Sequence, residues 1–407
     1  MSQLRVVIAP SGFKESLSAE EAAAAIAAGV RNAYPQAEIV ELPLVDGGEG
    51  FTTALVSATR GTLHRLQVTG PIGEPVDSHF GILGGNGEVR TAVLEMAAAA
   101  GLRLVPKEQR DPLRTTTYGV GELIKAALDA DARRILIGCG DSGTNDGGAG
   151  AAEALDVRLL KADGSPIGRG GAALAELDRI DTSNRDERLN NVTIDVACNI
   201  HNILCGEQGV ARVFGPQKGA SPETVEQLER ALERFADVVE RDVGVNVREM
   251  PGGGASGGMG AGLHALLGAT LHPRFDIIFE YFRLDEALQG ADLVLTAEGG
   301  INFQTPHGKI PSEVARRAKA RDLPVLAIAG SLSKGARDNY EIGIDAIFSI
   351  LREPCSLEEA IENAPELLEK CAEDVMRTLL VGKEIGKKLN KPLQEQRTIN
   401  ASGTERR

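Results

Sequence analysis

The chain has 407 residues and a formal net charge of −14, and 42% of its residues are hydrophobic. A chain of this length exceeds what one hydrophobic core usually organises, so we expect two domains. The acidic balance argues against a polyanionic partner such as nucleic acid, and an aromatic content of 3% argues against stacking platforms for single strands.

The first 60 residues show a strand–helix–strand–helix pattern. Ser18 and Glu21 have the spacing of a capping box, which predicts where the first helix begins. Such a start is typical of a parallel sheet covered by helices. The predicted strands are residues 4–9 and 38–44, and the predicted helices are residues 18–33 and 51–59.

The pattern changes after Gly61. Three strand-like segments follow one another without a helix between them, which predicts an antiparallel unit. These segments are residues 63–68, 76–83 and 89–96. Further on, we expect helices over residues 117–128, 149–155 and 222–242 and strands over residues 134–137 and 192–198.

The alternation of strands and helices returns near residue 291. Strands are predicted over residues 293–296, 325–329 and 346–349, and helices over residues 312–321 and 357–385. Because both ends of the chain share this pattern, we predict an α/β protein with a discontinuous parallel-sheet domain, residues 1–62 and 285–385. A second α/β domain, residues 63–284, is inserted into it, and residues 386–407 are expected to be a disordered tail.

The chain has the features of a cytoplasmic protein. Because a strand-like segment begins at Leu4, we expect no secretory leader, and no apolar run reaches the ~18 residues of a membrane span. Its five cysteines are scattered, as expected for reduced thiols. We therefore expect no membrane partner.

Four loops combine glycine with carboxylate or amide side chains: residues 45–50, 138–148, 251–258 and 297–302. Glycine lets the backbone approach a ligand closely, and consecutive N–H groups form a nest for anions. Carboxylates beside such a nest suit a complex of Mg²⁺ and phosphate. Asp46, Glu49, Asp141, Asp146 and Glu298 lie in these loops at or beyond strand ends, where open α/β sheets bind ligands. The loops therefore predict an enzyme that handles phosphate.

Two short motifs allow other interpretations. Gly138, Gly140 and Gly143 have the spacing of a dinucleotide fingerprint, which leaves an NAD-dependent hydroxy-acid dehydrogenase as one alternative. Residues 144–148 would, however, break the helix that such a site requires. Cys198, His201 and Cys205 could supply three zinc ligands, but a structural site needs four. A non-catalytic protein that binds sugar acids is the other alternative.

Six blocks resemble the bacterial glycerate kinase family, the type without a P-loop, over roughly residues 5–350. They occur in the family's order and cover residues 8–17, 46–50, 115–119, 142–150, 214–220 and 304–309. The resemblance implies transfer of phosphate from ATP to D-glycerate, giving 2-phosphoglycerate or 3-phosphoglycerate. It also implies a flavodoxin-like domain made from both chain ends and an active-site cleft between two domains. A homodimer is one option for the assembly.

The site hypothesis that follows from the resemblance names three sets of residues. Asp146 is the expected base, and Asp46 and Lys14 complete the catalytic set. Asp46, Glu49 and Glu298 are expected to hold Mg²⁺. The substrate and phosphates are expected to contact Lys14, Gly47, Gly48, Ser142, Gly143, Thr144, Asn145, Gly147, Gly148, Lys218, Gln304, Thr305 and Lys309.

The chain departs from the family's pattern at several of these loops. Glycine is common where Asp141 stands, and arginine is common where Gly300 stands. We expect a rearranged metal or substrate shell, which leaves the exact hydroxy-acid open. The departures are Ser11, Asp141, Asn199, His201, Gly300 and Asn302.

Overall fold

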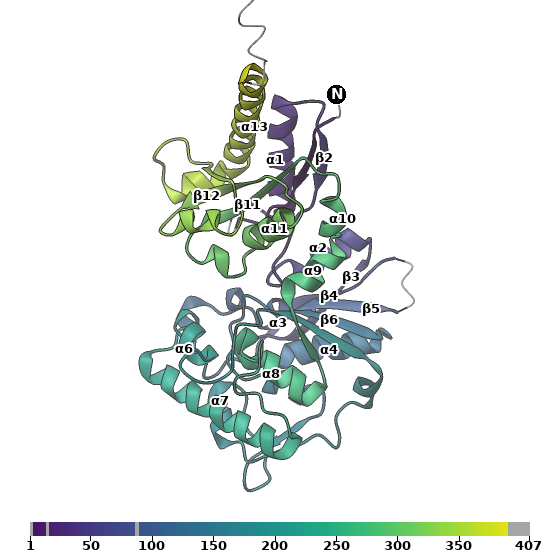
Figure 1. Cartoon of the computed structure of the whole chain (residues 1–407). Coiled ribbons are helices and arrows are strands. Elements are labelled where there is room, and N and C mark those ends of the chain that lie inside the picture. The colour runs from purple at the N-terminus through teal and green to yellow at the C-terminus, as the bar shows by residue number, and fades with distance from the viewer. Residues whose placement is uncertain (1–2, 14–15, 86–88, 390–407) are drawn as a thin grey trace, which may run out of the picture. The chain divides into compact units, whose positions relative to one another are not determined.

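The structure is a computed structural model that describes residues 3–13, 16–85 and 89–389. The chain divides into two compact units (Figure 1). Unit 1 comprises Met1–Pro43 and Glu286–Arg407, and unit 2 comprises Leu44–Asp285. Unit 2 begins at Leu44, where the inserted domain was expected from residue 63, and it ends at Asp285, where residue 284 was expected.

Unit 1 contains a five-stranded parallel sheet with the order β13-β12-β11-β1-β2. Numbered along this unit and read from the β2 edge, the order is the 2-1-3-4-5 of flavodoxin-like folds, as predicted. Val6, Val7 and Ile8 are fully buried, as expected for a parallel strand covered on both faces. The strands are β1 (Arg5–Ile8), β2 (Glu38–Glu41), β11 (Leu293–Ile301), β12 (Val325–Leu332) and β13 (Ala346–Ser349).

The helices of unit 1 include a close pair, α1 (Ala19–Ala33) and α13 (Ala364–Leu389), which pack along each other (Figure 1). Ser18 begins α1 with the predicted capping box: its Oγ accepts the N–H of Glu21 at 3.1 Å, and Glu21 Oε2 accepts the N–H of Ser18 at 2.8 Å. The other helices are α11 (Ile310–Lys319) and α12 (Leu357–Glu362), and α10 (Leu284–Ala287) spans the boundary between the units.

Unit 2 contains a six-stranded mixed sheet with the order β10-β9-β6-β5-β4-β3. The predicted antiparallel unit is confirmed, because β3, β4 and β5 pair in this way, and β5 then joins parallel strands. The strands are β3 (Thr62–Thr69), β4 (Pro75–Ile82), β5 (Thr91–Glu95), β6 (Arg134–Gly138), β9 (Thr193–Cys198) and β10 (Thr270–Pro273). A separate ribbon pairs β7 (Arg158–Leu160) with β8 (Arg179–Asp181).

The parallel strands of unit 2 end together at one edge of the sheet. The register pairs Glu95 with Gly138, Gly138 with Ala197, and Cys198 with Pro273. The loops that follow these strands therefore start side by side. The helices of this unit are α2 (Phe51–Thr59), α3 (Ala97–Ala100), α4 (Tyr118–Asp129), α5 (Ala149–Glu153), α6 (Val210–Phe214), α7 (Pro222–Val243), α8 (Ala255–Leu267) and α9 (Arg274–Tyr281).

The last helix extends further than expected. α13 continues to Leu389, so residues 386–389 of the predicted tail are helical, and residues 390–407 lie outside the described part of the chain. Within the described ranges, no helix combines the length and the apolar character needed to cross a bilayer.

The α1–α13 contact leads to a prediction about stability. A Cβ added to Gly29 of α1 would lie 2.2 Å from the carbonyl oxygen of Glu369 in α13. Because this clash can be relieved only if the two helix backbones move apart, we expect Gly29→Ala to lower the free energy of unfolding by about 1–3 kcal/mol. The measurement is urea denaturation followed by circular dichroism.

Gly382 provides the matched control, because it lies in α13 with nothing within 4 Å of an added Cβ. Gly382→Ala should stabilise the protein by about 0.5–1 kcal/mol through helix propensity alone. Equal urea midpoints for Gly29→Ala and the wild type would contradict the close packing of the two helices.

Candidate functional site

The loop 45–50 packs backbone to backbone against the loop that follows β6. A Cβ on Gly138 would lie 2.6 Å from the carbonyl oxygen of Gly47, and one on Gly140 would lie 2.7 Å from Cα of Gly48. Only glycine permits this approach at both positions. The Gly138-x-Gly140 spacing therefore serves loop packing, and the helix that a dinucleotide site would need begins only at Ala149.

Glu95, the last residue of β5, anchors the other end of the 45–50 loop. Its side chain is 2% exposed, with Oε1 accepting the N–H of Gly50 at 3.1 Å and Oε2 accepting that of Thr52 at 2.7 Å. Burial raises the pKa of Glu95, and the hydrogen bonds from Thr52 and Gly50 oppose that rise. A role for Glu95 was not predicted from the sequence, in which it is only an acidic residue at the end of an apolar strand.

Asp46 lies at the same edge of the sheet beside an arginine. Asp46 Oδ1 accepts the N–H of Gly48 at 3.2 Å, and Oδ2 lies 3.7 Å from Nη1 of Arg274, the first residue of α9. The Asp46 side chain is 43% exposed, whereas that of Arg274 is 16% exposed. A partly exposed carboxylate next to a mostly buried guanidinium is suited to bind a polar ligand. Arg274 was also missed, because it stands outside the glycine loops.

Asp141 joins the two loops and explains one departure from the family pattern. Its φ of 49° is left-handed, a conformation in which glycine is the easiest residue and aspartate one of the few alternatives. Asp141 Oδ2 accepts the N–H of Glu49 at 3.1 Å. Glu49 itself forms an ion pair with Arg103 at 3.1 Å. The extra carboxylate of this chain thus holds the 45–50 loop in place.

Asp146, the residue predicted to be the base, is 1% exposed and accepts five hydrogen bonds from the protein. The donors are the N–H and hydroxyl of Thr117, the hydroxyl of Thr116, and the N–H groups of Gly148 and Gly150. Burial raises the pKa of Asp146, and the bonds from Thr117 and the glycines oppose the rise. In this geometry the carboxylate of Asp146 organises the start of α5.

Lys218 is buried behind the same loop. It is 2% exposed, and its Nζ donates to Ser142 Oγ at 2.9 Å, to the Thr144 carbonyl at 2.7 Å and to Asn145 Oδ1 at 3.3 Å. Burial lowers the pKa of Lys218 to about 7, and the charge of Asp146 opposes that shift. Lys218 therefore sets the shape of residues 142–145.

Two buried polar atoms of the 142–148 loop have no hydrogen-bond partner within the ranges that the structure covers. They are Thr144 Oγ1 and Asn145 Nδ2. Because Lys218 holds the amide oxygen of Asn145, the NH₂ group points away from it and is able to donate. The loop continues through Gly147 and Gly148, both left-handed. Its donors suit an anionic or hydroxylated ligand.

The predicted residues of unit 1 gather at the start of α11. Glu298 Oε1 pairs with Nζ of Lys309, the residue that caps α11, at 2.8 Å. Thr305 is buried, and its hydroxyl accepts the N–H of Asn302 at 3.1 Å. Gln304 donates its N–H to Asn302 Oδ1 at 2.8 Å. Asn302 thus shapes this turn. Lys14 lies outside the described residues.

The described residues form no ready-made cluster of metal ligands. The described residues include no group of three or more histidine, cysteine, aspartate and glutamate side chains that could hold a metal ion. Mg²⁺ bound to ATP needs only one or two carboxylates, since phosphates and waters supply the rest. The alternative zinc site fails the same test, and Cys198 instead donates to the His272 carbonyl at 3.7 Å.

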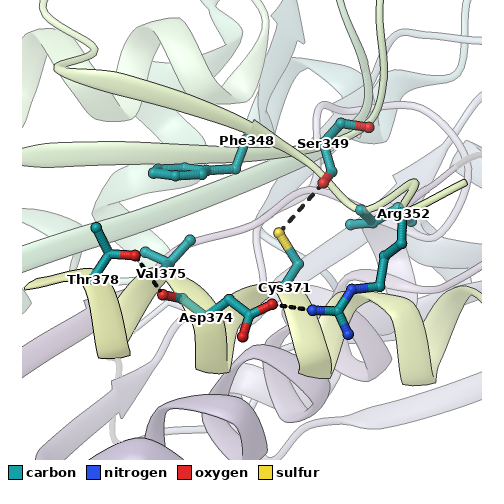
Figure 2. Close-up of a pocket in the computed structure, with 8 residues that line it drawn as sticks. Phe348, Ser349, Arg352, Cys371, Asp374, Val375 and Thr378 are labelled. Carbon is teal, nitrogen blue, oxygen red and sulfur yellow. Dashed lines mark hydrogen bonds and ion pairs between the residues drawn. The ribbon is translucent and has the colours of Figure 1, made fainter.

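A cavity of about 170 Å³ lies between β13 and α13 in unit 1 and contains none of the predicted site residues (Figure 2). Its polar groups pair with one another: Arg352 contacts Asp374, whose carbonyl accepts from the Thr378 hydroxyl at 2.8 Å, and the Cys371 thiol donates to the Ser349 carbonyl at 3.6 Å. We regard this cavity as part of the packing of α13.

Comparison with known proteins identifies the relatives of this chain. The family described as "Glycerate kinase family" matches residues 6–380. The glycerate kinase of Bacillus subtilis (strain 168) is 49% identical over 93% of this chain and 99% of its own length, and the glycerate 2-kinase of Escherichia coli (strain K12) is 45% identical over the same shares. A crystal structure of putative glycerate kinase 2 from Salmonella typhimurium LT2 is 48% identical, covers 94% of this chain and 100% of that one, and superposes with a TM-score of 0.81.

The burial of Lys218 leads to a prediction about pH. Its pKa falls from 10.5 to about 7 in the fold, so the unfolded chain binds more protons between these values. The contribution of Lys218 to the free energy of unfolding is therefore flat below pH 7 and rises above it. We expect the stability difference between the wild type and Lys218→Met to shift in favour of the wild type as the pH is raised from 7 towards 10, measured by urea denaturation.

Lys161→Met is the control, because Lys161 is exposed and its hydrogen bond to Glu176 raises its pKa instead. That variant should show no such gain above pH 7. A Lys218→Met difference that stays constant with pH would mean that Lys218 keeps its proton in the folded protein.

Proposed function

The chain belongs to the glycerate kinase family, and on that basis we propose that it transfers the γ-phosphoryl group of ATP to D-glycerate to give 2-phosphoglycerate. The observation that carries the proposal is a family match over residues 6–380, joined by relatives at 45–49% identity along almost their whole length. The choice of the 2-position follows the E. coli relative, which is a glycerate 2-kinase.

The two alternatives drawn from the sequence are not supported. The comparisons point to kinases, and the glycine spacing behind the dehydrogenase interpretation serves the packing of two loops in unit 2. Nothing in the comparisons favours a protein that binds sugar acids without turnover.

We assign the base to Asp46 and a positioning role to Asp146. Asp46 is partly exposed at the strand ends, with one oxygen held by its own loop and the other turned towards Arg274. Asp146 is enclosed by five donors. In the proposed reaction the substrate hydroxyl loses its proton to Asp46 as its oxygen bonds to the γ-phosphorus, and the bond to ADP breaks.

The phosphates and the metal complete the proposal. The N–H groups of Gly48, Glu49 and Gly50 are already held by Asp46, Asp141 and Glu95, so the anionic oxygens are proposed to bind at the start of α11, where Lys309 supplies a positive charge. Glu49 and Glu298 are proposed to hold the Mg²⁺ that accompanies ATP, directly or through water. When bound, the ion neutralises charge on the transferring group.

The proposal also includes a cytoplasmic location and a homodimeric assembly. Light scattering of the purified chain at several concentrations tests the assembly.

We expect the purified chain to release ADP from Mg²⁺-ATP when D-glycerate is present. A coupled ADP assay with a panel of hydroxy-acids measures this, and phosphorus NMR identifies the product. ATP turnover that does not exceed the acid-free background with any acid would overturn the kinase assignment.

Two aspartate variants separate the base from the positioning residue. Asp46→Asn should lower kcat by about 10²–10⁴-fold with an unchanged free energy of unfolding, because an amide cannot take the proton. Asp146→Asn should lower the free energy of unfolding by about 1–3 kcal/mol, because its NH₂ group cannot accept the bonds that the carboxylate accepts. Near-normal turnover by Asp46→Asn in the same assay would remove the base assignment.

A further inference from the structure

Arg110 is a charged residue of unit 2 that the proposed chemistry does not use. Its backbone packs against Gly219, since a Cβ added to Gly219 would lie 2.3 Å from the carbonyl oxygen of Arg110 and 2.9 Å from its Cβ. Gly219 directly follows Lys218, whose Nζ donates to residues 142, 144 and 145. The side chain of Arg110 therefore starts beside the lysine that reaches into the 142–148 loop.

The segment that carries Arg110 follows this loop on both sides. Before Arg110, the N–H of Leu102 donates to the carbonyl of Asp141 at 2.8 Å. After Arg110, the hydroxyl of Thr115 donates to the carbonyl of Gly143 at 2.9 Å. Because both flanks are bonded to the loop, the position of Arg110 is fixed relative to it.

Three polar atoms in this region are buried without a hydrogen-bond partner in the part of the chain that the structure covers. They are Arg110 Nε, Thr144 Oγ1 and Asn145 Nδ2. Thr144 and Asn145 are fully buried, and Arg110 forms no ion pair within the described ranges. A buried donor without a partner costs about 1–3 kcal/mol, so a ligand that accepts from these groups would remove an existing cost.

Lys218 cannot itself supply the charge that such a ligand needs. An ammonium group has three N–H donors, and the three acceptors Ser142 Oγ, the Thr144 carbonyl and Asn145 Oδ1 use all of them. Burial also lowers the pKa of Lys218 to about 7, so its charge is incomplete at neutral pH. A guanidinium is always charged in proteins and carries five donors.

The donors match a phosphoryl group better than a carboxylate. A hydroxyl, an amide NH₂ and a guanidinium are three separate donor groups, and a phosphoryl group presents three oxygens where a carboxylate presents two. The 138–148 loop also packs against the loop of Asp46, because Gly138 and Gly140 approach the backbone of Gly47 and Gly48. A phosphoryl group here would lie in the same unit as the proposed base.

We propose that Arg110, Thr144 and Asn145 bind the transferred phosphoryl group and hold it in the phosphoglycerate product. The inference rests on the proposed function, with Asp46 as the base. In the transfer step the substrate oxygen bonds to the γ-phosphorus, the bond from that phosphorus to the β–γ bridging oxygen breaks with its electrons leaving on ADP, and the hydroxyl proton moves to Asp46. Arg110, Thr144 and Asn145 exchange no proton and stabilise the charge on the phosphoryl oxygens.

The first test compares Arg110→Gln with the wild type, using the full chain and calorimetric titration without ATP. Loss of a charged donor should weaken binding of the phosphoglycerate product by about 10- to 100-fold, while binding of D-glycerate changes less than about twofold. Arg114→Gln is the matched control, because Arg114 is exposed on the same segment. That variant should bind both compounds as the wild type does.

The second test uses Thr144→Val and keeps the proposal testable if Arg110→Gln does not fold. The hydroxyl of Thr144 has no partner among the described residues, so a methyl group in its place should leave the urea midpoint unchanged or raise it. The same variant should bind the phosphoglycerate product about 3- to 10-fold more weakly. A residue that only supports the fold would not lose product affinity without losing stability.

The outcomes distinguish this inference from the function on which it rests. Product affinity that is unchanged in a folded Arg110→Gln variant would overturn the site, and so would a variant that loses affinity for D-glycerate to the same extent as for the product. Both results leave the kinase intact. A wild type that phosphorylates no acid at all would instead refute the proposed function.

Discussion

The site of unit 2 depends on a buried carboxylate, that of Glu95, which acts together with the exposed carboxylate of Asp141. The 45–50 loop belongs to neither a helix nor a strand, so its backbone donors must find partners elsewhere. Glu95, the last residue of β5, accepts the N–H of Gly50 from this loop and that of Thr52 from the first turn of α2, and it pairs in register with Gly138 of β6. A buried donor left without a partner costs about 1–3 kcal/mol, so these hydrogen bonds fix the loop relative to the end of β5. The position of Asp46 follows from that anchor.

Buried charges shape the neighbouring loop as well. Asp146 collects donors from residues 116–117 and 148–150, and Lys218 donates to residues 142, 144 and 145 from the other side. Taking these charges out of water is tolerable only because each one is surrounded by partners. Asp146 and Lys218, which were predicted to contribute to catalysis and ligand binding, therefore also stabilise this loop.

Local signals in the sequence were enough to predict the architecture. The capping box of α1, the apolar run of β1 and the helix-free segment of β3 to β5 all depend on neighbouring residues, and the structure agrees with them. The contacts of Glu95 with Thr52 and of Arg274 with Asp46 span 43 and more than 200 residues, which no local pattern encodes. The burial of a charged residue is also not evident from the sequence. Lys218 stands in a short loop like any solvated lysine, and only the packing around it shows that burial lowers its pKa.

The left-handed backbone of Asp141 has a consequence for how such loops change over generations. A glycine codon becomes an aspartate codon by one base substitution, and aspartate tolerates this backbone conformation better than most residues. A carboxylate can therefore enter the loop in one mutational step with its backbone path unaltered, and here it is met at once by the N–H of Glu49. At positions of this kind, a single substitution can add a charge to a loop while the backbone conformation of the loop is kept.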